Sequence, residues 1–387
     1  MDRQIELELI DELLALKAAK TPFLDEEIGS SPVENYLSDQ IFEQERTRIF
    51  SGLPHSPAHS SELDGPGAFL RCDVNGLPVL LTRDKQGEVR AFLNICRHRG
   101  ARLVEEEKGC KHRFSCPYHA WTYASSGELI GAPHFETGFV REDASAEKAA
   151  ISLKSLPAKE AFGLIWVVPD PGGSFDFDGW FSAMDSEIAA LGMGDMYIAA
   201  ENRIELDANW KIIVEGGIEA YHFKVAHRTT IGPFFEDNLS SYRSYGPHMR
   251  SILPRKSMAS LADEERETWR VRDHANILYT LFPTTQMLVQ QDHIVWITTQ
   301  PWSAAKTGVR MVTLAPRQGA LAEGKDASHW AQNHAITTST LKEDFDLAEG
   351  IQAGLWSGAN DYLSFGRFEG ALDVFNQTVT GFTRLGE

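Results

Sequence analysis

The chain has 387 residues, and its composition excludes several broad classes of protein. Hydrophobic residues make up 42% of it, which is ordinary for a globular protein, and no run approaches the ~20 apolar residues of a membrane span. A formal net charge of −18 argues against nucleic acid as a partner, because phosphate contacts require a basic surface. Four cysteines give no disulfide framework and the acidic N-terminus resembles no secretory signal, so we expect a cytoplasmic protein.

Residues 1–44 are predicted to form an N-terminal helical segment that packs on the C-terminal domain. Ile5, Leu9, Leu13 and Leu16 are near helical spacing with acidic residues between them, and Pro22 ends the helix.

Residues 45–168 have the pattern of a small antiparallel β domain. Short alternating strands are separated by turn signals, of which Asn75-Gly76 is the strongest and Ser125-Ser126-Gly127 another. The stretch from Pro169 to Gly179 is rich in proline, glycine and aspartate and is predicted to be a linker.

Residues 169–387 mix strands with two predicted helices, Trp210 to Ala226 and Ala335 to Gly354. Runs of strands with segregated helices predict an α+β domain in which helices cover one face of an antiparallel sheet.

Two short cysteine–histidine pairs in the β domain predict a metal site. Cys96-x-His98 and Cys116-x-x-His119 each place one thiolate and one imidazole on a tight loop, and we expect both loops at hairpin tips. Two sulfur and two nitrogen ligands suit either zinc or an iron–sulfur cluster. Zinc more often takes Cys-x-x-Cys spacing, so a zinc site is the less favoured alternative. The two remaining cysteines fit neither pair.

A second candidate site lies in the predicted helix of residues 210–226. Glu219 and His222 are three residues apart and share a helical face. His227 follows five residues after His222, about 140° away on an ideal helix, so both imidazoles can reach one ion only if the helix ends or bulges between them. Two histidines and a carboxylate are the ligand set of non-haem Fe(II) oxygenases.

The segment from Asn94 to Tyr123, with its Cys-Pro-Tyr-His-Ala-Trp run, resembles the cluster-binding segment of Rieske non-haem iron oxygenases, the family of aromatic-ring-hydroxylating dioxygenase alpha subunits. The resemblance implies a 2Fe-2S cluster with Cys96 and Cys116 on one iron and His98 and His119 on the other. The late helix "LKEDFDLAEGIQAGL" is similar to the stretch that carries the third ligand of the mononuclear iron. This similarity assigns that role to Asp344, with Asp346 as the alternative.

The resemblance also implies an architecture and an assembly. Residues 45–168 would form the Rieske domain and residues 169–387 a catalytic domain of helix-grip, START-like fold. The family is typically a head-to-tail trimer, in which Glu219 would bridge His222 to His119 of a neighbouring subunit. Many relatives have aspartate at this position. Gly216-Gly217 departs from the family pattern, which opens space beside the iron and makes the start of the helix less certain.

The function implied is that of a terminal oxygenase, which uses O2 and electrons from an NAD(P)H-dependent reductase, with or without a ferredoxin. Basic residues between Cys96 and Arg113 are typical either of a docking rim for an acidic donor or of a solvated loop. An aromatic or other hydrophobic substrate is expected, possible pocket residues being Phe223, Phe234, Phe235 and those of 277–299. Demethylation or oxidation of a quaternary ammonium compound, a Rieske electron carrier and a zinc-held module are the alternatives.

Overall fold

The computed structural model describes residues 1–319 and 321–384, and the chain divides into two compact units. One unit contains residues 1–49 and 181–387, and the other contains residues 50–180. Both are built on antiparallel sheets, and the predicted α+β class is confirmed. No helix in the described part of the chain is long and apolar enough to cross a membrane.

The unit of residues 50–180 contains three small sheets with the strand orders β10-β5-β4-β3-β6, β11-β12-β2 and β7-β8-β9. Its strands are β2 (His55–His59), β3 (Ala68–Val74), β4 (Leu77–Arg83), β5 (Val89–Leu93), β6 (Lys108–Cys110), β7 (Arg113–Ser115), β8 (Thr122–Ala124), β9 (Leu129–Gly131), β10 (Ser155–Leu156), β11 (Ala158–Ala161) and β12 (Leu164–Val167). Short helices α4 (Phe135–Gly138) and α5 (Ala144–Ala150) follow β9.

The predicted turns of this unit are confirmed. Asn75 and Gly76 join β3 to β4 with φ angles of 51° and 84°, a conformation that asparagine and glycine adopt readily. Residues 125–128 join β8 to β9, and within this turn Gly127 has a φ of 97°.

The other unit is built on a seven-stranded antiparallel sheet of order β13-β19-β18-β17-β16-β15-β14. Its strands are β13 (Met196–Leu206), β14 (Ser241–Tyr245), β15 (His248–Pro254), β16 (Ala275–Leu281), β17 (Thr285–Val289), β18 (Ile294–Ser303) and β19 (Lys306–Pro316). A separate two-stranded sheet pairs β1 (Gly29–Pro32) with β20 (Tyr362–Phe365), which joins the N-terminal segment to the end of the chain.

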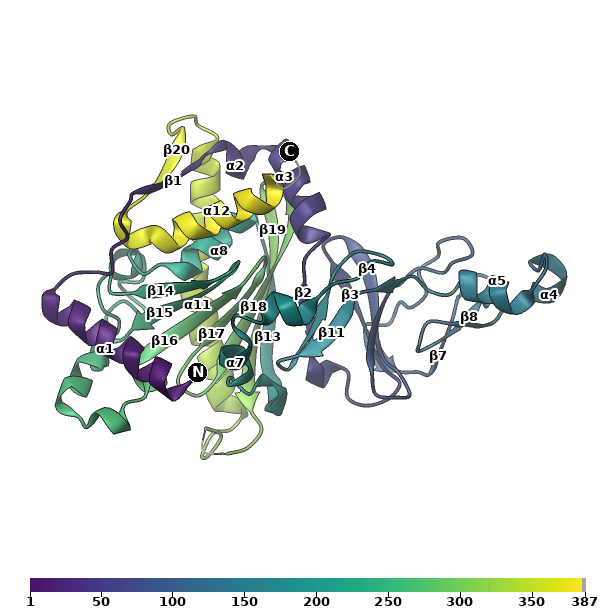
Figure 1. The fold of residues 1–387 in the computed structure, drawn as a ribbon, viewed down its shortest axis with the longest axis horizontal. Helices are drawn as coiled ribbons and strands as arrows, with labels where there is room; N and C mark the ends of the chain where they lie inside the picture. Colours follow the sequence, from purple (N-terminus) through teal and green to yellow (C-terminus); the bar gives the residue numbers. More distant parts are fainter. Residues whose placement is uncertain (320, 385–387) are drawn as a thin grey trace. The chain divides into compact units, whose positions relative to one another are not determined.

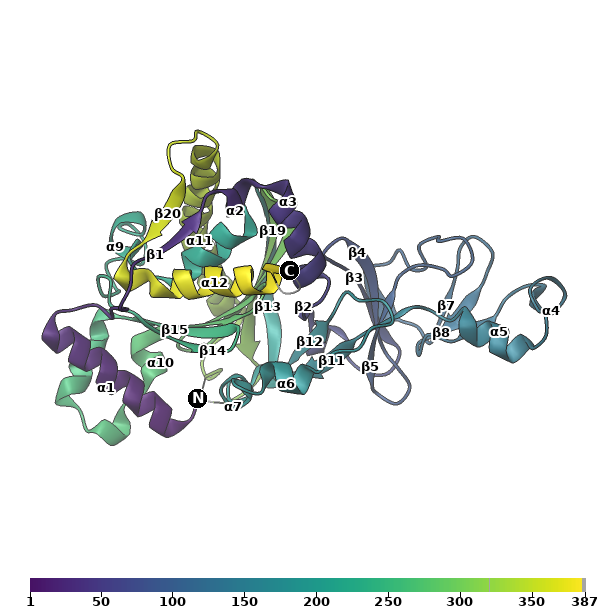
Figure 2. The same ribbon diagram turned by 45° about the horizontal axis from the view of Figure 1, so that its top comes forward.

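Four helices position the second candidate site. They are α8 (Trp210–Ile218), α9 (Phe223–Ala226), α11 (Ala327–Leu355) and α12 (Gly370–Arg384). Helix α8 lies between the sheet and α12 (Figures 1 and 2), and α11 packs on α8, β13 and β19. The remaining α-helices are α1 (Arg3–Ala19), α2 (Glu34–Leu37), α3 (Asp39–Glu45), α6 (Phe177–Phe181), α7 (Asp185–Ala189) and α10 (Val271–His274).

Two helix predictions need correction. The single helix expected over residues 210–226 is two helices, α8 and α9, separated by an extended residue at Glu219. The helix expected from Ala335 begins at Ala327 instead, because the Asp326 side chain caps it by accepting from the backbone N–H groups of Ser328 and His329.

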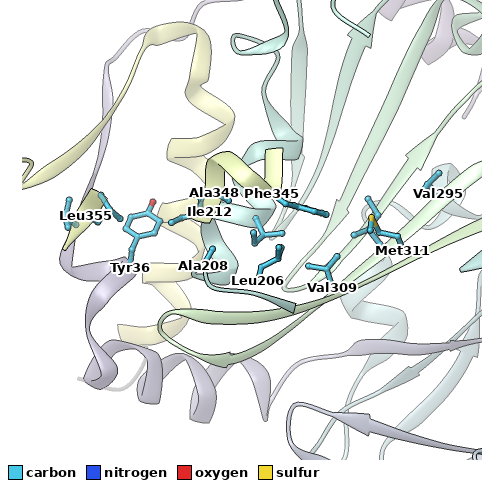
Figure 3. Packing of buried hydrophobic residues seen from close by; sticks show 13 residues of the cluster. Tyr36, Leu206, Ala208, Ile212, Val295, Val309, Met311, Phe345, Ala348 and Leu355 are labelled. Carbon is cyan, nitrogen blue, oxygen red and sulfur yellow. The ribbon is translucent and has the colours of Figure 1, made fainter. Parts of the chain in front are cut away.

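A buried apolar cluster holds α8 and α11 against the sheet (Figure 3). Ile212 comes from α8, Phe345 and Ala348 come from α11, and Val295 and Met311 come from the sheet. Each large side chain buried here contributes about 1.5–3 kcal/mol. The cluster therefore fixes the two helices that carry the candidate site.

Candidate metal centres

The first candidate centre consists of two loops in the unit of residues 50–180. The Cys116 to His119 loop is the tip of the β7–β8 hairpin, where the backbone N–H of Cys116 donates to the carbonyl of Trp121 at 2.8 Å. The Cys96 to His98 loop connects β5 to β6, which do not pair with each other, so the expectation of a hairpin tip is wrong there. An isolated bridge between Ile95 and Arg102 closes this loop instead.

The side chains of the two loops are oriented toward a shared centre. The imidazole rings of His98 and His119 lie with their centroids 4.6 Å apart, and Trp121 stacks on His98 at 4.8 Å with an interplanar angle of 9°. Cys96 and Cys116 are buried, whereas the two histidines are half-buried. Thiols therefore lie on the inner side of the centre and imidazoles lie toward its surface.

These residues fit a Rieske cluster. Among the described residues, the buried Nδ1 of His98 has no hydrogen-bond partner, as expected of an atom that serves as a metal ligand. Burial raises the pKa of the Cys96 thiol, and a metal would be needed to hold the thiolate there. The Tyr123 hydroxyl lies 3.6 Å from the Cys96 sulfur, close enough for a hydrogen bond. Hydrogen bonds to the sulfur ligands of an iron–sulfur cluster tune its reduction potential.

The second candidate centre lies where α8 ends and α9 begins. Glu219 is extended, with φ −126° and ψ 166°, and breaks the helical path. His222 and His227 then flank the single turn of α9, so their rings turn toward each other with the two Nε2 atoms 3.2 Å apart. Helix α8 thus ends before both histidines, whereas the sequence required a helix end or a bulge between them; the rings converge because α9 is a single turn that ends at Ala226, directly before His227.

Asp344 on α11 completes a group of three possible ligands. Its Oδ1 lies 3.0 Å from Nε2 of His227 and 3.5 Å from Nε2 of His222. Bonds of about 2.1 Å to one ion would place neighbouring ligand atoms about 3 Å apart at right angles. The three side chains are thus arranged to hold a metal ion on one face, and the donor set is the one that non-haem iron uses. Asp346 is exposed and pairs with Lys342.

A carboxylate orients each histidine of the group. The Nδ1–H of His222 donates to Glu219, as the spacing predicts. The Nδ1–H of His227 donates to Glu343 at 2.7 Å, and Glu343 also accepts a hydrogen bond from Thr230. With both Nδ1 atoms engaged, both Nε2 lone pairs face the centre.

Sequence reasoning did not identify Glu343, although its position directly before Asp344 was the available signal. Its hydrogen bond from His227 lowers the pKa of Glu343. Burial alone would lower the pKa of His227, but its bonds to Asp344 and Glu343 outweigh that effect and raise it.

A mainly apolar cavity of about 110 Å³ adjoins His227 and Asp344, and we call it the inner pocket. Its apolar wall consists of Ile213, Phe223, Ile231, Leu253, Leu278, Leu288, Ile297, Ile336, Leu341 and Phe345, and the remaining lining residues are polar or glycine. Phe223 lies in this wall, and Phe234 and Phe235 line a neighbouring cavity instead.

Apart from Asp344, the residues that α11 contributes to the inner pocket were not predicted. Thr337, Thr340 and Leu341 precede Asp344 by seven, four and three residues, which places them on one helical face with this predicted iron ligand. That shared face was the signal available in the sequence.

Gly216 and Gly217 also line the inner pocket. A Cβ on Gly216 would meet nothing within 4 Å, whereas one on Gly217 would lie 3.1 Å from Gln286 and 3.3 Å from Leu278. Space therefore opens beside Gly216, as expected from the sequence. The two glycines occupy the last turn of α8 and do not disturb its start, where Asn209 caps the helix by accepting from the N–H of Lys211.

Comparisons with known proteins give the same picture. Residues 55–156 match the sequence model of the Rieske [2Fe-2S] domain, and residues 193–383 match the model described as "Ring hydroxylating alpha subunit (catalytic domain)". Together the two models imply a Rieske cluster and a mononuclear iron, the two cofactors expected from the sequence.

Individual relatives cover part of the chain. The glycine betaine monooxygenase oxygenase subunit of Chromohalobacter salexigens is 30% identical over 260 residues, which are 66% of this chain and 56% of the relative. The carnitine monooxygenase oxygenase subunit of Acinetobacter baumannii is 33% identical over 210 residues, 53% of this chain and 53% of the relative. The chain thus spans about half the length of these curated relatives.

A crystal structure of the quaternary ammonium Rieske monooxygenase CntA with an inhibitor has the same fold, with a TM-score of 0.77, 21% identity and coverage of 94% of this chain and 97% of that one. The two family models, the relatives and the shared fold agree with the two centres described above, and the chain belongs to the Rieske non-haem iron oxygenases as an alpha subunit.

Proposed function

We propose that the chain is the terminal oxygenase component of a multicomponent enzyme that incorporates oxygen from O2 into a small organic molecule. The single observation that carries this proposal is the His222, His227 and Asp344 group, which opens onto the apolar inner pocket. A metal whose three protein ligands lie on one side keeps its remaining coordination positions free, and the pocket places an organic molecule beside those positions.

The proposed roles of the site residues follow from their chemistry. Cys96, His98, Cys116 and His119 hold the cluster, whereas His222, His227 and Asp344 hold the mononuclear iron. When bound, the cluster supplies electrons one at a time and the iron supplies O2 activation. Apolar side chains exclude water and position the substrate.

Glu219 is proposed to connect two subunits of a head-to-tail trimer. Its Oε1 accepts from His222, and its Oε2 accepts from the backbone N–H of Tyr221, so the carboxylate is held in one orientation. A carboxylate oxygen has more than one acceptor site, and the partner subunit's His119 would donate to the same group. The carboxylate would then link the two centres across the interface.

Electrons are proposed to arrive from an NAD(P)H-dependent reductase, directly or through a ferredoxin. The basic residues near the cluster loops are only partly neutralised by neighbours: Arg102 pairs with Glu105 at 3.4 Å and Lys111 with Glu106 at 2.5 Å. Arg97 and Arg99 lie on the same loop as His98 and leave positive charge near the centre, which suits an acidic donor.

Two substrate classes are supported by different observations. The apolar wall of the inner pocket suits an aromatic or other hydrophobic group. The relatives' names favour oxidation of an N-methyl group on a quaternary ammonium compound. Phe223 and Phe345 are the aromatic residues in the described wall that such a cation would contact, and Asp344 is the only carboxylate among the described residues that line the pocket.

Turnover under 18O2 with a reconstituted reductase tests the proposal. A panel of naphthalene, indole, glycine betaine and L-carnitine should give at least one labelled product. One labelled atom would indicate monooxygenation or demethylation, and two would indicate dihydroxylation. A protein with a reducible cluster that labels no product and retains no mononuclear iron would be an electron carrier instead, and a colourless protein with stoichiometric zinc would be a zinc module.

Glu219→Gln tests the bridge between the centres. The variant should retain both the cluster and the mononuclear iron, because Glu219 is not a ligand of either, yet turnover should stop because electrons no longer cross the interface. Iron analysis and the rate of cluster re-oxidation by O2 in the presence of substrate measure the two parts. Re-oxidation at the parent rate would rule out the bridge.

A further inference from the structure

A second cavity of about 820 Å³, which we call the outer cavity, lies directly beside the inner pocket. The two cavities share part of their walls, namely Ile231, Asn276, Gln290, Ile336 and Thr340. A molecule that enters the outer cavity is therefore separated from the inner pocket only by side chains that belong to both.

The outer cavity carries positive charge without a compensating acid. Arg255 and Lys256 line it, and its wall contains no aspartate or glutamate among the described residues. Lys256 is exposed, and its Nζ donates to the carbonyl of Pro233 at 2.7 Å. Arg255 is half-buried and is the cation that lies deeper in the wall.

Arg255 is held in place but not neutralised. Its backbone N–H donates to the carbonyl of His274 at 2.8 Å, one guanidinium nitrogen donates to Oδ1 of Asn276 at 2.9 Å, and the guanidinium lies 5.8 Å from the ring centroid of Phe235. Within the described part of the chain its buried Nε has no hydrogen-bond partner. The charges of Asp273 and Asp292 reach it only through space.

Such an arrangement is costly unless an anion occupies it. A guanidinium remains charged at neutral pH, and half-burying it without a carboxylate partner loses hydration that the hydrogen bond to Asn276 and the contact with Phe235 replace only in part. Its planar N–H groups suit a carboxylate, which can accept two hydrogen bonds in parallel. Asn276 lines both cavities and accepts a hydrogen bond from Arg255, so an anion at Arg255 would lie next to the wall that the two cavities share.

We propose that Arg255 determines substrate specificity by binding a carboxylate at the end of the substrate opposite to the carbon that is oxidised. The inference rests on the proposed function in taking the inner pocket as the place of oxidation. It identifies the substrate class as a small organic acid with an apolar or methylated end. An aromatic carboxylate and a betaine, which carries both a carboxylate and a methylated ammonium, both meet this description.

Binding of matched probes to the anaerobic holoenzyme tests the proposal without turnover. Hexanoate and hexanamide have the same apolar tail and nearly the same size, but only hexanoate carries a negative charge. Isothermal titration calorimetry compares their dissociation constants. We expect hexanoate to bind at least ten-fold more tightly than hexanamide. Hexyltrimethylammonium should bind more weakly than either, because it brings a cation to Arg255.

Variants assign the preference to one side chain. Arg255→Gln should remove the preference for hexanoate while leaving hexanamide binding within two-fold, and Arg255→Lys should restore part of it. Arg243→Gln removes the same charge from an exposed position on β14 that lines neither cavity, and should retain the full preference. Each comparison uses the ratio of the hexanamide and hexanoate dissociation constants measured on the same folded variant. A general loss of stability therefore does not mimic the result.

Three results would overturn the proposal: equal binding of hexanoate and hexanamide, absence of hexanoate binding, or an unchanged preference in Arg255→Gln. Acetate lacks the apolar tail and should bind far more weakly than hexanoate; equal affinity would make this a site for free small anions instead. If the 18O2 experiment gives no labelled product but the protein still prefers hexanoate, the oxygenase function is rejected and the carboxylate-binding site at Arg255 stands.

Discussion

At the scale of single residues, the candidate iron site is organised as ligands and the carboxylates that orient them. His222 and His227 each use Nδ1 to donate to a carboxylate, Glu219 in one case and Glu343 in the other. This fixes the tautomer of each ring and leaves Nε2 free for the metal. The two carboxylates have different proposed roles. Glu343 orients His227 within one subunit, whereas Glu219 orients His222 and also connects to a second subunit.

Glu343 is predicted to raise the affinity of the site for iron. In Glu343→Gln the side chain keeps its size but loses its charge, so the ring of His227 is a weaker donor to the metal and is less firmly oriented. We expect the dissociation constant for Fe(II) to rise about 10- to 100-fold. Anaerobic titration of the iron-free mononuclear site measures this directly.

The control for this variant is Asp346→Asn on the same helix. Asp346 is exposed and pairs with Lys342 at the surface, so its loss should leave iron affinity unchanged. An affinity of Glu343→Gln equal to that of the control would mean that Glu343 does not support the metal.

At the scale of secondary structure, the break between α8 and α9 creates the site. The spacing of His222 and His227 predicted that the helix must end or bulge between them, and the structure shows that it ends before both. The position of the break could not be predicted, because the extended backbone of Glu219 depends on tertiary packing, including burial of Ala220 next to it. Local propensity would have favoured a break at the glycines instead.

The two glycines at the end of α8 are predicted to respond differently to substitution by alanine. Gly216→Ala adds a methyl group to open space and should stabilise the protein by up to about 1 kcal/mol through helix propensity. Gly217→Ala must displace Gln286 and Leu278, so that gain is lost and the variant should be no more stable than the parent. Thermal unfolding of both variants measures the difference, and a higher stability of Gly217→Ala would contradict this account of the pocket wall.

At the scale of the whole molecule, much of the fold was predictable from the sequence. Turn signals such as Asn75-Gly76 specify hairpins locally, and the α+β class follows from the order of strands and helices. Contacts between distant segments were not predictable in the same way. The sequence predicted that the N-terminal segment packs on the C-terminal domain, and residues 1–49 do belong to the same unit as residues 181–387. No local pattern indicates the individual contacts, such as the buried ion pair between Glu45 and Lys211.

The stability of the unit of residues 50–180 should depend on the protonation of His55. Burial lowers the pKa of His55 from 6.5 to about 4. Between these values the unfolded chain binds the proton more tightly than the folded chain, so the free energy of unfolding falls as the pH falls from 6.5 to about 4. A difference of this size corresponds to roughly 3 kcal/mol.

Two variants isolate this contribution. His55→Gln should flatten the decline of the unfolding temperature between pH 7 and pH 4.5, whereas His112→Gln, which replaces an exposed histidine of the same unit, should leave it unchanged. Circular dichroism at a series of pH values measures both. If the unfolding temperatures of His55→Gln and the parent protein fall in parallel with pH, His55 is not the source of the decline.

The central claim is that one chain holds two separate iron centres, and iron analysis of Asp344→Ala beside the parent protein tests it most directly. We predict that the parent contains one iron per chain beyond the pair of its 2Fe-2S cluster, and that Asp344→Ala loses this iron while the visible spectrum of the cluster is unchanged. Equal iron content in the two proteins, or loss of the cluster spectrum together with the iron, would contradict the account.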